Sequence, residues 1–386
     1  MRVLYLSRLV FESQKANVYN TVRTCEALAR AGAEVTLVSS DAGASTREQL
    51  KAFRDHYHLD DSFKILSLQG ISNRTRNSKL AVLLSNLELI AVAIRKRGEC
   101  DCIYVRDARV APAGIFCAWI LRKPVFFEAH AVLVGTRNKF LGDTLARASR
   151  GVIAITHALA EYFRTLNQNT IVSYCAAAEP ERFARITQPK AQLREQLNLP
   201  QEKFILCYTG NLVRTGNNDP YGIEDIIAAM PYLPPDTVFI GVGKFVDETK
   251  ELEEFATTLG VTDRVRFLPW VSKDKVAEYL LAADMLLIPS AGARMGNAPT
   301  KMFDYMVSGV PIVAANTVPI REVLTDKKTA LLVEYKKPEA WAEAVTTFRH
   351  DAVLRYSIVM RAKEEGGQYT WDNRGTEILT FLNSLI

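Results

Sequence analysis

The sequence predicts an α/β protein of two Rossmann-like, doubly wound parallel-sheet domains that face each other across a cleft. The chain has 386 residues, more than a single hydrophobic core usually organises. Apolar runs of strand length alternate with helical patterns in both halves, which is typical of parallel sheets covered on both faces. A polar, proline-containing stretch at residues 176–200 interrupts this alternation, which then restarts, so the linker separates two domains.

The first half begins with an expected strand at residues 3–7 and a helix at 17–32 that ends at a glycine. Apolar runs predict further strands at residues 35–39, 102–105, 125–128 and 152–155. These elements place the first domain at residues 1–180. A last helix, at 371–386, is expected to pack back on it.

The second half repeats the pattern and is expected to form a domain at residues 188–370. Its six expected strands cover residues 204–208, 238–242, 265–268, 285–288, 312–314 and 330–333. Six strands with helices between them are enough for one doubly wound sheet. The cleft between the two domains is the expected binding site.

Charge divides unevenly between the halves. Residues 1–186 carry 26 Lys and Arg against 17 Asp and Glu, a net charge of +9, whereas the rest carries −4. Basic residues also flank the apolar segment 80–94, a pattern that suits an anionic membrane face, an anionic acceptor or a solvated basic surface.

Other patterns limit the class of protein. The sequence contains no apolar run long enough to span a membrane and no signal-peptide pattern, so we expect a cytoplasmic protein that contacts the inner membrane face at most peripherally. Its six scattered cysteines fit reduced thiols rather than disulfides. The absence of Asp-x-Asp argues against a carboxylate-held metal, and we expect neither a metal, nor a cofactor, nor a nucleic-acid partner.

Three strands of the second half are followed by loops that suit a phosphorylated ligand. Gly210 permits close backbone approach and Arg214 offers a planar fork for phosphate. Gly243 and Lys244 again combine a small residue with a cation, and Trp270 and Val271 place an aromatic ring and backbone groups where a base can lie. Ligands collect at the carboxyl ends of parallel strands, so these loops are expected to share one edge.

A fourth loop end reads "GNAPTKMFDYMVSGVPIV", from residue 296 onward. Asn297 and Ala298 precede a proline that favours a helix start, which leaves the amides of Thr300 and Lys301 exposed at the positive end of the helix. Lys301 can neutralise phosphate, and Asp304, one turn later, can accept hydrogen bonds from a ribose. Complementation of the helix dipole alone is the simpler explanation of Asp304.

These residues resemble glycosyltransferase family 4, retaining enzymes with the two-domain GT-B fold. The resemblance covers most of the second half, in the segments "YTGNL", "FIGVG", "PTKMFDYMVSGVPIVAANTVPIREVL" and "YTWDNRG". It is thinner in the first half, where it rests on "CEALARAGAEVTLVSS" and "FFEAH". The branch that reads Pro-x-Lys-x-Phe-Asp/Glu-Tyr, in place of the full Glu-x7-Glu signature, is the most similar.

The resemblance implies roles for particular residues. Asp304 takes the place of the second signature acid, which holds the donor ribose, whereas Gly296 stands where the first would be. The family's phosphate-binding Arg and Lys fall at Asn211 and Tyr221, so Arg214, Lys244 or Lys301 is expected to substitute.

In the first half, His130 matches the family's histidine near the transferred sugar. Asn17, at a helix start, replaces a glycine pair and is the candidate for contacting donor or acceptor.

The resemblance implies a metal-independent glycosyltransferase that moves a sugar from a UDP- or GDP-sugar to an acceptor hydroxyl with retention of configuration. The expected acceptor is a lipid-linked or anionic glycan in surface polysaccharide or glycolipid assembly. Two alternatives stay open. A non-hydrolysing sugar-nucleotide epimerase shares the architecture, and a catalytically degenerate GT-B binding protein would explain the departures at Gly296, Asn211 and Tyr221.

Overall fold

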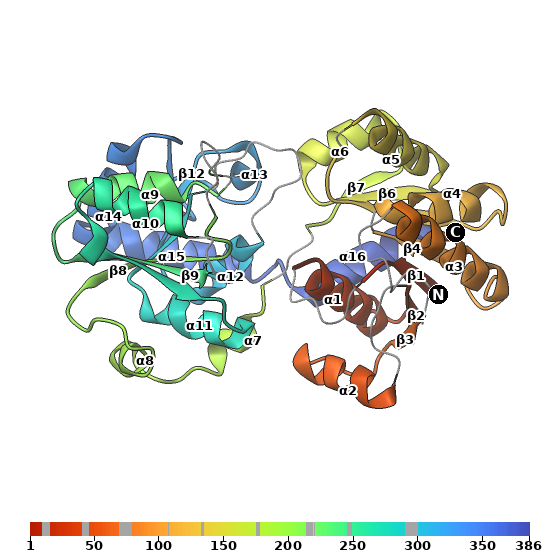
Figure 1. The fold of residues 1–386 in the computed structure, drawn as a ribbon, viewed down its shortest axis with the longest axis horizontal. Coiled ribbons are helices and arrows are strands. Elements are labelled where there is room, and N and C mark those ends of the chain that lie inside the picture. The colour runs from red at the N-terminus through yellow and green to blue at the C-terminus, as the bar shows by residue number, and fades with distance from the viewer. Residues whose placement is uncertain are drawn as a thin grey trace. The chain divides into compact units, whose positions relative to one another are not determined.

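The computed structural model describes residues 1–9, 16–40, 46–68, 79–106, 108–132, 135–174, 178–213, 219, 221–244, 249–289 and 300–386. The chain divides into two compact units. Unit 1 comprises Met1–Cys175 together with Trp371–Ile386, and unit 2 comprises Ala176–Thr370 (Figure 1). No described helix is both long enough and apolar enough to cross a membrane.

Unit 1 contains a parallel sheet of seven strands in the order β3-β2-β1-β4-β5-β6-β7. The strands are β1 (Arg2–Ser7), β2 (Glu34–Ser39), β3 (Lys64–Ser67), β4 (Cys102–Val105), β5 (Val125–Ala129), β6 (Gly151–Ala154) and β7 (Thr170–Val172). The described helices are α1 (Ala16–Arg30), α2 (Arg47–His56), α3 (Lys79–Arg95), α4 (Ala111–Trp119), α5 (Thr136–Ala148), α6 (His157–Arg164) and α16 (Trp371–Ser384), with a 3₁₀ turn, η2 (Ala108–Val110).

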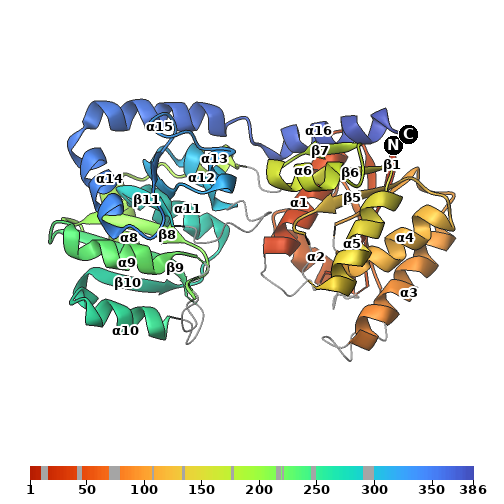
Figure 2. The same cartoon turned by 90° about the horizontal axis from the view of Figure 1, so that it is seen from above.

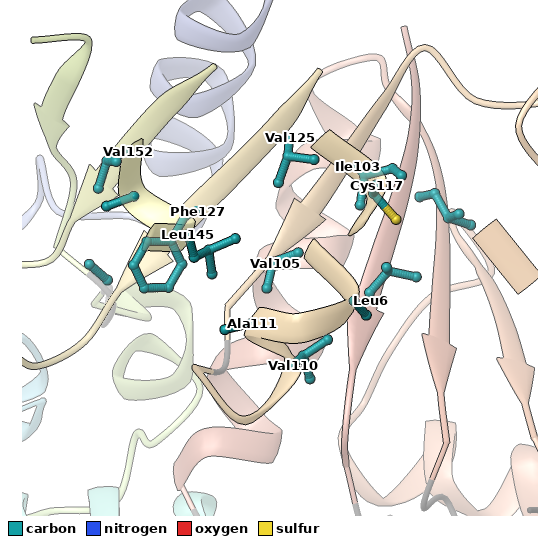
Figure 3. Packing of buried hydrophobic residues seen from close by; sticks show 14 of the residues in the cluster. Leu6, Ile103, Val105, Val110, Ala111, Cys117, Val125, Phe127, Leu145 and Val152 are labelled. Carbon is teal, nitrogen blue, oxygen red and sulfur yellow. The ribbon is translucent and has the colours of Figure 1, made fainter. Parts of the chain in front are cut away.

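Helices cover both faces of this sheet. One face packs against α3, α4, α5 and α6, and Figure 3 shows Leu6, Val105 and Phe127 of the strands against Cys117 and Leu145 of the helices. The other face packs against α1, α2 and α16, which contributes Ile378 and two leucines. Figure 2 shows α3, α4 and α5 together on one side of the strands. The C-terminal helix is therefore part of the core of unit 1.

Unit 2 contains a parallel sheet of six strands in the order β10-β9-β8-β11-β12-β13. The strands are β8 (Phe204–Thr209), β9 (Thr237–Lys244), β10 (Val265–Pro269), β11 (Met285–Ile288), β12 (Ile312–Ala315) and β13 (Leu331–Val333). The described helices are α7 (Pro180–Ala184), α8 (Lys190–Gln196), α9 (Ile223–Ala229), α10 (Lys250–Thr258), α11 (Lys273–Ala282), α12 (Lys301–Ser308), α13 (Val318–Arg321), α14 (Pro338–His350) and α15 (Ala352–Gly366), with 3₁₀ turns η3 (Met230–Tyr232) and η4 (Thr262–Arg264).

Both sheets have doubly wound strand orders, so the predicted fold class of two Rossmann-like parallel-sheet units is confirmed. The strand order reverses between β1 and β4 in unit 1 and between β8 and β11 in unit 2. In such sheets ligands bind beyond the carboxyl ends of the strands at the reversal point. The residues after β8 and β11, and after β1 and β4, are therefore the first places to look for a site.

Candidate functional site

Two glycines bring neighbouring strand ends of the second sheet into contact. Gly210, directly after β8, has φ +135°, and Gly243, near the end of β9, has φ +131°. A Cβ atom on Gly243 would lie 2.2 Å from the carbonyl oxygen of Gly210, so no side chain fits there. The Gly210 amide donates a hydrogen bond to the Val242 carbonyl at 2.8 Å. The two glycines thus hold the loop after β8 against β9, beside the reversal point of the sheet.

Lys301, the first residue of α12, points to this glycine corner. Its Nζ lies 3.5 Å from the centroid of the Tyr208 ring, and a Cβ atom on Gly210 would lie 2.6 Å from the same nitrogen. None of the ion pairs among the described residues involves Lys301. Burial lowers the pKa of Lys301 well below its ordinary value of 10.5. A half-buried amine without an anionic partner, at the reversal point of a doubly wound sheet, is typical of an anion site.

Asp304 lies one turn further along α12 and is only 8% exposed. Its Oδ2 lies 3.3 Å from Nζ of Lys273, the first residue of α11. Its Oδ1 is buried and has no hydrogen-bond partner among the described residues. A buried carboxylate oxygen without a donor is uncommon in folded proteins, and a ligand hydroxyl would satisfy it. The next residue, Tyr305, accepts a hydrogen bond from the Thr209 amide at 2.9 Å, which fixes α12 to the end of β8.

The loop after β10 joins the same group of residues. The Trp270 amide donates to the Lys244 carbonyl at 3.1 Å, and Val271 precedes Lys273, the partner of Asp304, by two positions. The Lys244 amine pairs with Glu253 at 2.7 Å. Lys244 therefore already has an anionic partner inside unit 2, whereas Lys301 has none among the described residues.

The two positions where the family resemblance implies basic residues are bonded to each other. The Asn211 side-chain amide donates to the Tyr221 hydroxyl at 2.7 Å, and the Tyr208 hydroxyl donates to the Asn211 carbonyl at 3.1 Å. Two neutral, hydrogen-bonded side chains thus stand where the resemblance implies two cations. Lys301, over the ring of Tyr208, is a described cation at the end of β8.

Thr300 precedes α12 and makes no side-chain cap, so its hydroxyl does not satisfy the amides of the first turn. Three other residues expected at the site, Arg214, Asn297 and Ala298, lie outside the described residues, as does the proline at which we expected the helix to start. Their roles stay predictions.

His130 in unit 1 belongs to a buried group of charges at the ends of β4 and β5. Its Nε2 lies 2.6 Å from Oε1 of Glu128 and 2.8 Å from Nε of Arg106. Glu128 also lies 3.0 Å from Nη2 of Arg374 and accepts a hydrogen bond from the Tyr104 hydroxyl at 2.5 Å. Both oxygens of the Glu128 carboxylate therefore have polar partners: His130 and Arg106 at Oε1, and Tyr104 and Arg374 at Oε2.

Burial and neighbouring charges together set the pKa values of His130 and Glu128. Burial, reinforced by the Arg106 charge, lowers the pKa of His130 to about 4, against the opposing effect of Glu128. Burial alone would raise the pKa of Glu128, but Arg374, His130 and Arg106 outweigh it and hold that pKa well below 4.5. Near neutral pH the imidazole is therefore neutral and the carboxyl group is ionised.

Asn17, in the first turn of α1, lies beside the same charges. Arg106 donates from Nη1 to the Asn17 carbonyl at 3.0 Å and to the Thr21 hydroxyl at 3.1 Å. Oδ1 of Asn17 is buried and finds no hydrogen-bond partner in the described part of the chain. Arg106 therefore connects the two residues that sequence analysis placed at this site, Asn17 and His130.

Sequence analysis did not assign Arg106, Arg374 or Lys273 to a site. Arg106 directly follows an apolar strand, and Glu128 is a charge inside the apolar run "VFFEA", which indicates a buried partner. That partner, Arg374, comes from the last helix, and no sequence signal connects the two. The approach of Lys273 to Asp304 likewise depends on how α11 packs against α12.

Comparison with known proteins adds to this geometry. Residues 189–365 match the family model described as glycosyl transferases group 1. Over 94% of its length the chain is 29% identical to D-inositol 3-phosphate glycosyltransferase from Jonesia denitrificans, 89% of which is covered. It is 26% identical over 54% of its length to the enzyme of that name from Corynebacterium urealyticum, of which the match covers 50%. The chain thus spans about half the length of most of the curated relatives it matches.

Solved structures share the fold at low sequence identity. Anabaena Alr3699/HepE in complex with UDP has a TM-score of 0.78, 22% identity and complete coverage of both chains. Sucrose-phosphate synthase from Thermosynechococcus elongatus has a TM-score of 0.77 and 18% identity, with 100% of this chain and 99% of that one covered. The chain therefore has the two-unit fold of GT-B glycosyltransferases, and its residues 189–365 are similar to the family described as glycosyl transferases group 1.

Proposed function

We propose that the chain is a retaining glycosyltransferase that moves a sugar from a nucleoside-diphosphate sugar to an acceptor hydroxyl. The observation that carries this proposal is Lys301, a half-buried amine with no carboxylate partner among the described residues, held against Tyr208 and Gly210. A diphosphate supplies the missing negative charge. The structural neighbour that binds UDP and UDP-glucose, together with the matched domain, supports a nucleotide-sugar donor.

The unpartnered oxygen of Asp304 is proposed to accept a hydrogen bond from the ribose of the donor. Lys273 already pairs with the other oxygen of this carboxylate, so Oδ1 is left to face a ligand as an acceptor. The Trp270 loop, joined to this corner through Lys273, is proposed to lie against the base. Each contact uses a group that the fold leaves unsatisfied or exposed.

In the proposed reaction the bond between the anomeric carbon and the diphosphate oxygen breaks, and a bond to the acceptor oxygen forms on the same face. The acceptor proton passes to the departing diphosphate oxygen, so no protein base is needed. Negative charge grows on the leaving group, and Lys301 and the amides at the start of α12 stabilise it. This role requires neither a metal nor another cofactor. His130, neutral near pH 7, acts as a hydrogen-bonding group toward the sugar rather than as a cation.

The acceptor is proposed to be a lipid-linked or anionic glycan in the assembly of surface polysaccharide or glycolipid. The net charge of +9 over residues 1–186 supports this class because an anionic acceptor, or the anionic inner face of a membrane, attracts a basic unit. A cytoplasmic protein with peripheral membrane contact fits this acceptor.

Incubation of the purified chain with a panel of UDP- and GDP-sugars tests the proposal. We expect slow hydrolysis or transfer of one donor, and stabilisation by the matching nucleoside diphosphate of about 2.7 kcal/mol at one hundred times its Kd. Lys301→Met should lower turnover by about tenfold to a thousandfold. Lys250→Met is the matched control, because that lysine is exposed and 4.0 Å from Glu254. Isomerisation of the donor would indicate an epimerase, and binding without turnover a degenerate binding protein.

A further inference from the structure

Helix α3 (Lys79–Arg95) is apolar on two opposite faces, and only one of them is covered. One face, with Ala81, Leu89 and Val92, is buried in unit 1 against α4 and the sheet. The opposite face carries Leu80, Leu83, Leu87 and Ile94. These four side chains, here called the α3 stripe, are 56%, 56%, 54% and 43% exposed. Helices that are apolar all round are normally buried on every side, so the stripe indicates a missing contact.

The spacing of the stripe makes it continuous. Its members follow each other at intervals of three, four and seven residues, which places them along one side of a helix. At a rise of about 1.5 Å per residue the stripe is roughly 20 Å long. An apolar surface of this length is larger than the single exposed leucines that most proteins carry.

Cations without described partners lie at both ends of the stripe. Lys79 begins the helix, and Arg95 and Arg97 stand at and just after its end, all of them exposed. No described carboxylate forms an ion pair with any of the three. Lys96, between the two arginines, pairs with Glu99 at 2.7 Å. The occupant of the stripe must therefore be apolar along its middle and anionic at its ends.

A second copy of the chain does not meet this requirement. A two-fold axis would place the stripe against itself. With parallel helices Lys79 would meet Lys79 of the other copy, and with antiparallel helices Lys79 would meet Arg95 and Arg97. Like charges would meet in both arrangements, which opposes pairing.

We propose that the α3 stripe inserts into the interface of an anionic lipid bilayer, with α3 parallel to the membrane plane. The leucines would enter the boundary between headgroups and acyl chains, and the three cations would contact anionic headgroups. This surface deepens the proposed function because it names the partner that would present a lipid-linked acceptor. Ser85, in the middle of α3, accepts a hydrogen bond from Nε of Arg8, which follows β1, at 3.1 Å. The buried face of α3 is thus fixed to the carboxyl end of β1, on the side of the helix opposite the stripe.

Co-sedimentation of the full chain with lipid vesicles tests this surface. The vesicles contain phosphatidylcholine with about one third phosphatidylglycerol, and vesicles of phosphatidylcholine alone serve for comparison. We expect binding to the anionic vesicles and at least tenfold weaker binding for Leu83→Ser/Leu87→Ser. Arg95→Gln/Arg97→Gln should reduce the preference for anionic vesicles. The matched control is Val353→Ser/Tyr356→Ser on α15, which replaces two side chains that are 81% and 68% exposed and should bind as the unchanged protein does.

Three results would overturn the proposal. They are absence of vesicle binding by the unchanged protein, equal binding by the stripe variant, and a dimer in light scattering that becomes a monomer in that variant. Stabilisation by UDP and GDP is measured on the same samples. The stripe variant should keep it, because its substitutions lie in unit 1, outside the proposed nucleotide site. Absence of nucleotide binding by the unchanged protein would contradict the proposed function but would not contradict the proposed membrane surface.

Discussion

Arg374 of the C-terminal helix lies 3.0 Å from Glu128, at the end of a central strand of unit 1. Both side chains are almost completely buried, at 4% and 0% exposed. Arg374 also donates to the Tyr174 carbonyl at 2.6 Å and to the Thr24 hydroxyl at 2.8 Å. Arg374 thus acts together with Arg106 on the carboxylate that contacts His130, and it also joins α16 to the rest of the unit.

Arg374→Met should destabilise unit 1 by about 3–5 kcal/mol, because it leaves a buried carboxylate with one charged partner fewer. Urea unfolding followed by circular dichroism measures the change. The control is Arg361→Met, which removes an exposed pair with Glu365 and should cost less than about 1 kcal/mol. Equal effects of the two substitutions would show that the buried pair adds nothing to stability.

Acid should destabilise unit 1 through His130. The folded unit lowers the pKa of this imidazole to about 4 from its ordinary 6.5, so between these values the unfolded chain binds a proton that the folded one does not. Stability should therefore fall as the pH is lowered through this window. Glu128, whose pKa is held well below 4.5, adds to the loss only at still lower pH.

Unfolding free energies at about pH 7 and about pH 5 measure this slope. His130→Gln should flatten it, whereas His350→Gln, at an exposed position of unit 2, should leave it unchanged. A slope that persists in His130→Gln would assign the acid sensitivity to another group.

UDP binding should be coupled to proton uptake at Lys301. Burial lowers the pKa of this amine, and a bound diphosphate would raise it again. Affinity for UDP should then fall as the pH rises through the pKa of the free protein. Titration calorimetry in two buffers of different protonation enthalpy measures the uptake. We expect it to disappear in Lys301→Met and to persist in Lys250→Met. An uptake that survives in Lys301→Met would exclude this amine as its source.

Asp304→Ala should weaken UDP binding at least tenfold, about 1.4 kcal/mol, with little loss of folding stability. Stability should change little because no described residue hydrogen-bonds Oδ1 of Asp304 and its ion pair with Lys273 is partly exposed. Calorimetry with UDP and thermal unfolding give the two quantities. Asp274→Ala is the control, because Asp274 lies next to Lys273 on α11 but pairs with Arg182. Unchanged affinity in Asp304→Ala would remove this carboxylate from the site.

Gly243→Ala should damage the glycine corner that Gly243 forms with Gly210. The methyl group would lie 2.2 Å from the Gly210 carbonyl oxygen, and φ of +131° is strained for alanine. We expect a loss of at least 1–3 kcal/mol in stability, roughly, together with weaker UDP binding. Gly98→Ala, where a Cβ atom meets nothing within 4 Å, should be nearly neutral in both measurements. A stable Gly243→Ala protein with full UDP affinity would show that the corner can rearrange.

Continuous apolar strands were predicted closely from the sequence. The strand expected at residues 3–7 is Arg2–Ser7, and the helix expected at 17–32 is Ala16–Arg30. Sequence analysis did not include β3 (Lys64–Ser67) or β7 (Thr170–Val172). Both are short edge strands with partly exposed residues, so neither presents an uninterrupted apolar run.

The places of the candidate residues in the fold could be predicted where local rules apply. Lys301 and Asp304 were expected at the start of a helix that follows a strand, and Gly243 at a strand end. The pairing of Lys244 with Glu253 and of Asp304 with Lys273 could not be predicted, because each pair depends on the packing of side chains from separate elements. The hydrogen bond between Asn211 and Tyr221 joins the two positions where the resemblance implied basic residues, and the resemblance alone could not predict it.

The return of α16 to unit 1 has a consequence for synthesis on the ribosome. Glu128 is translated long before Arg374, and all of unit 2 lies between them in the chain. The nascent first unit has Arg106 beside this carboxylate but must wait for Arg374, with one face of its sheet open where Ile378 and Leu382 will later pack. Unit 2 can complete its own core earlier, so the order of maturation is the reverse of the order of translation.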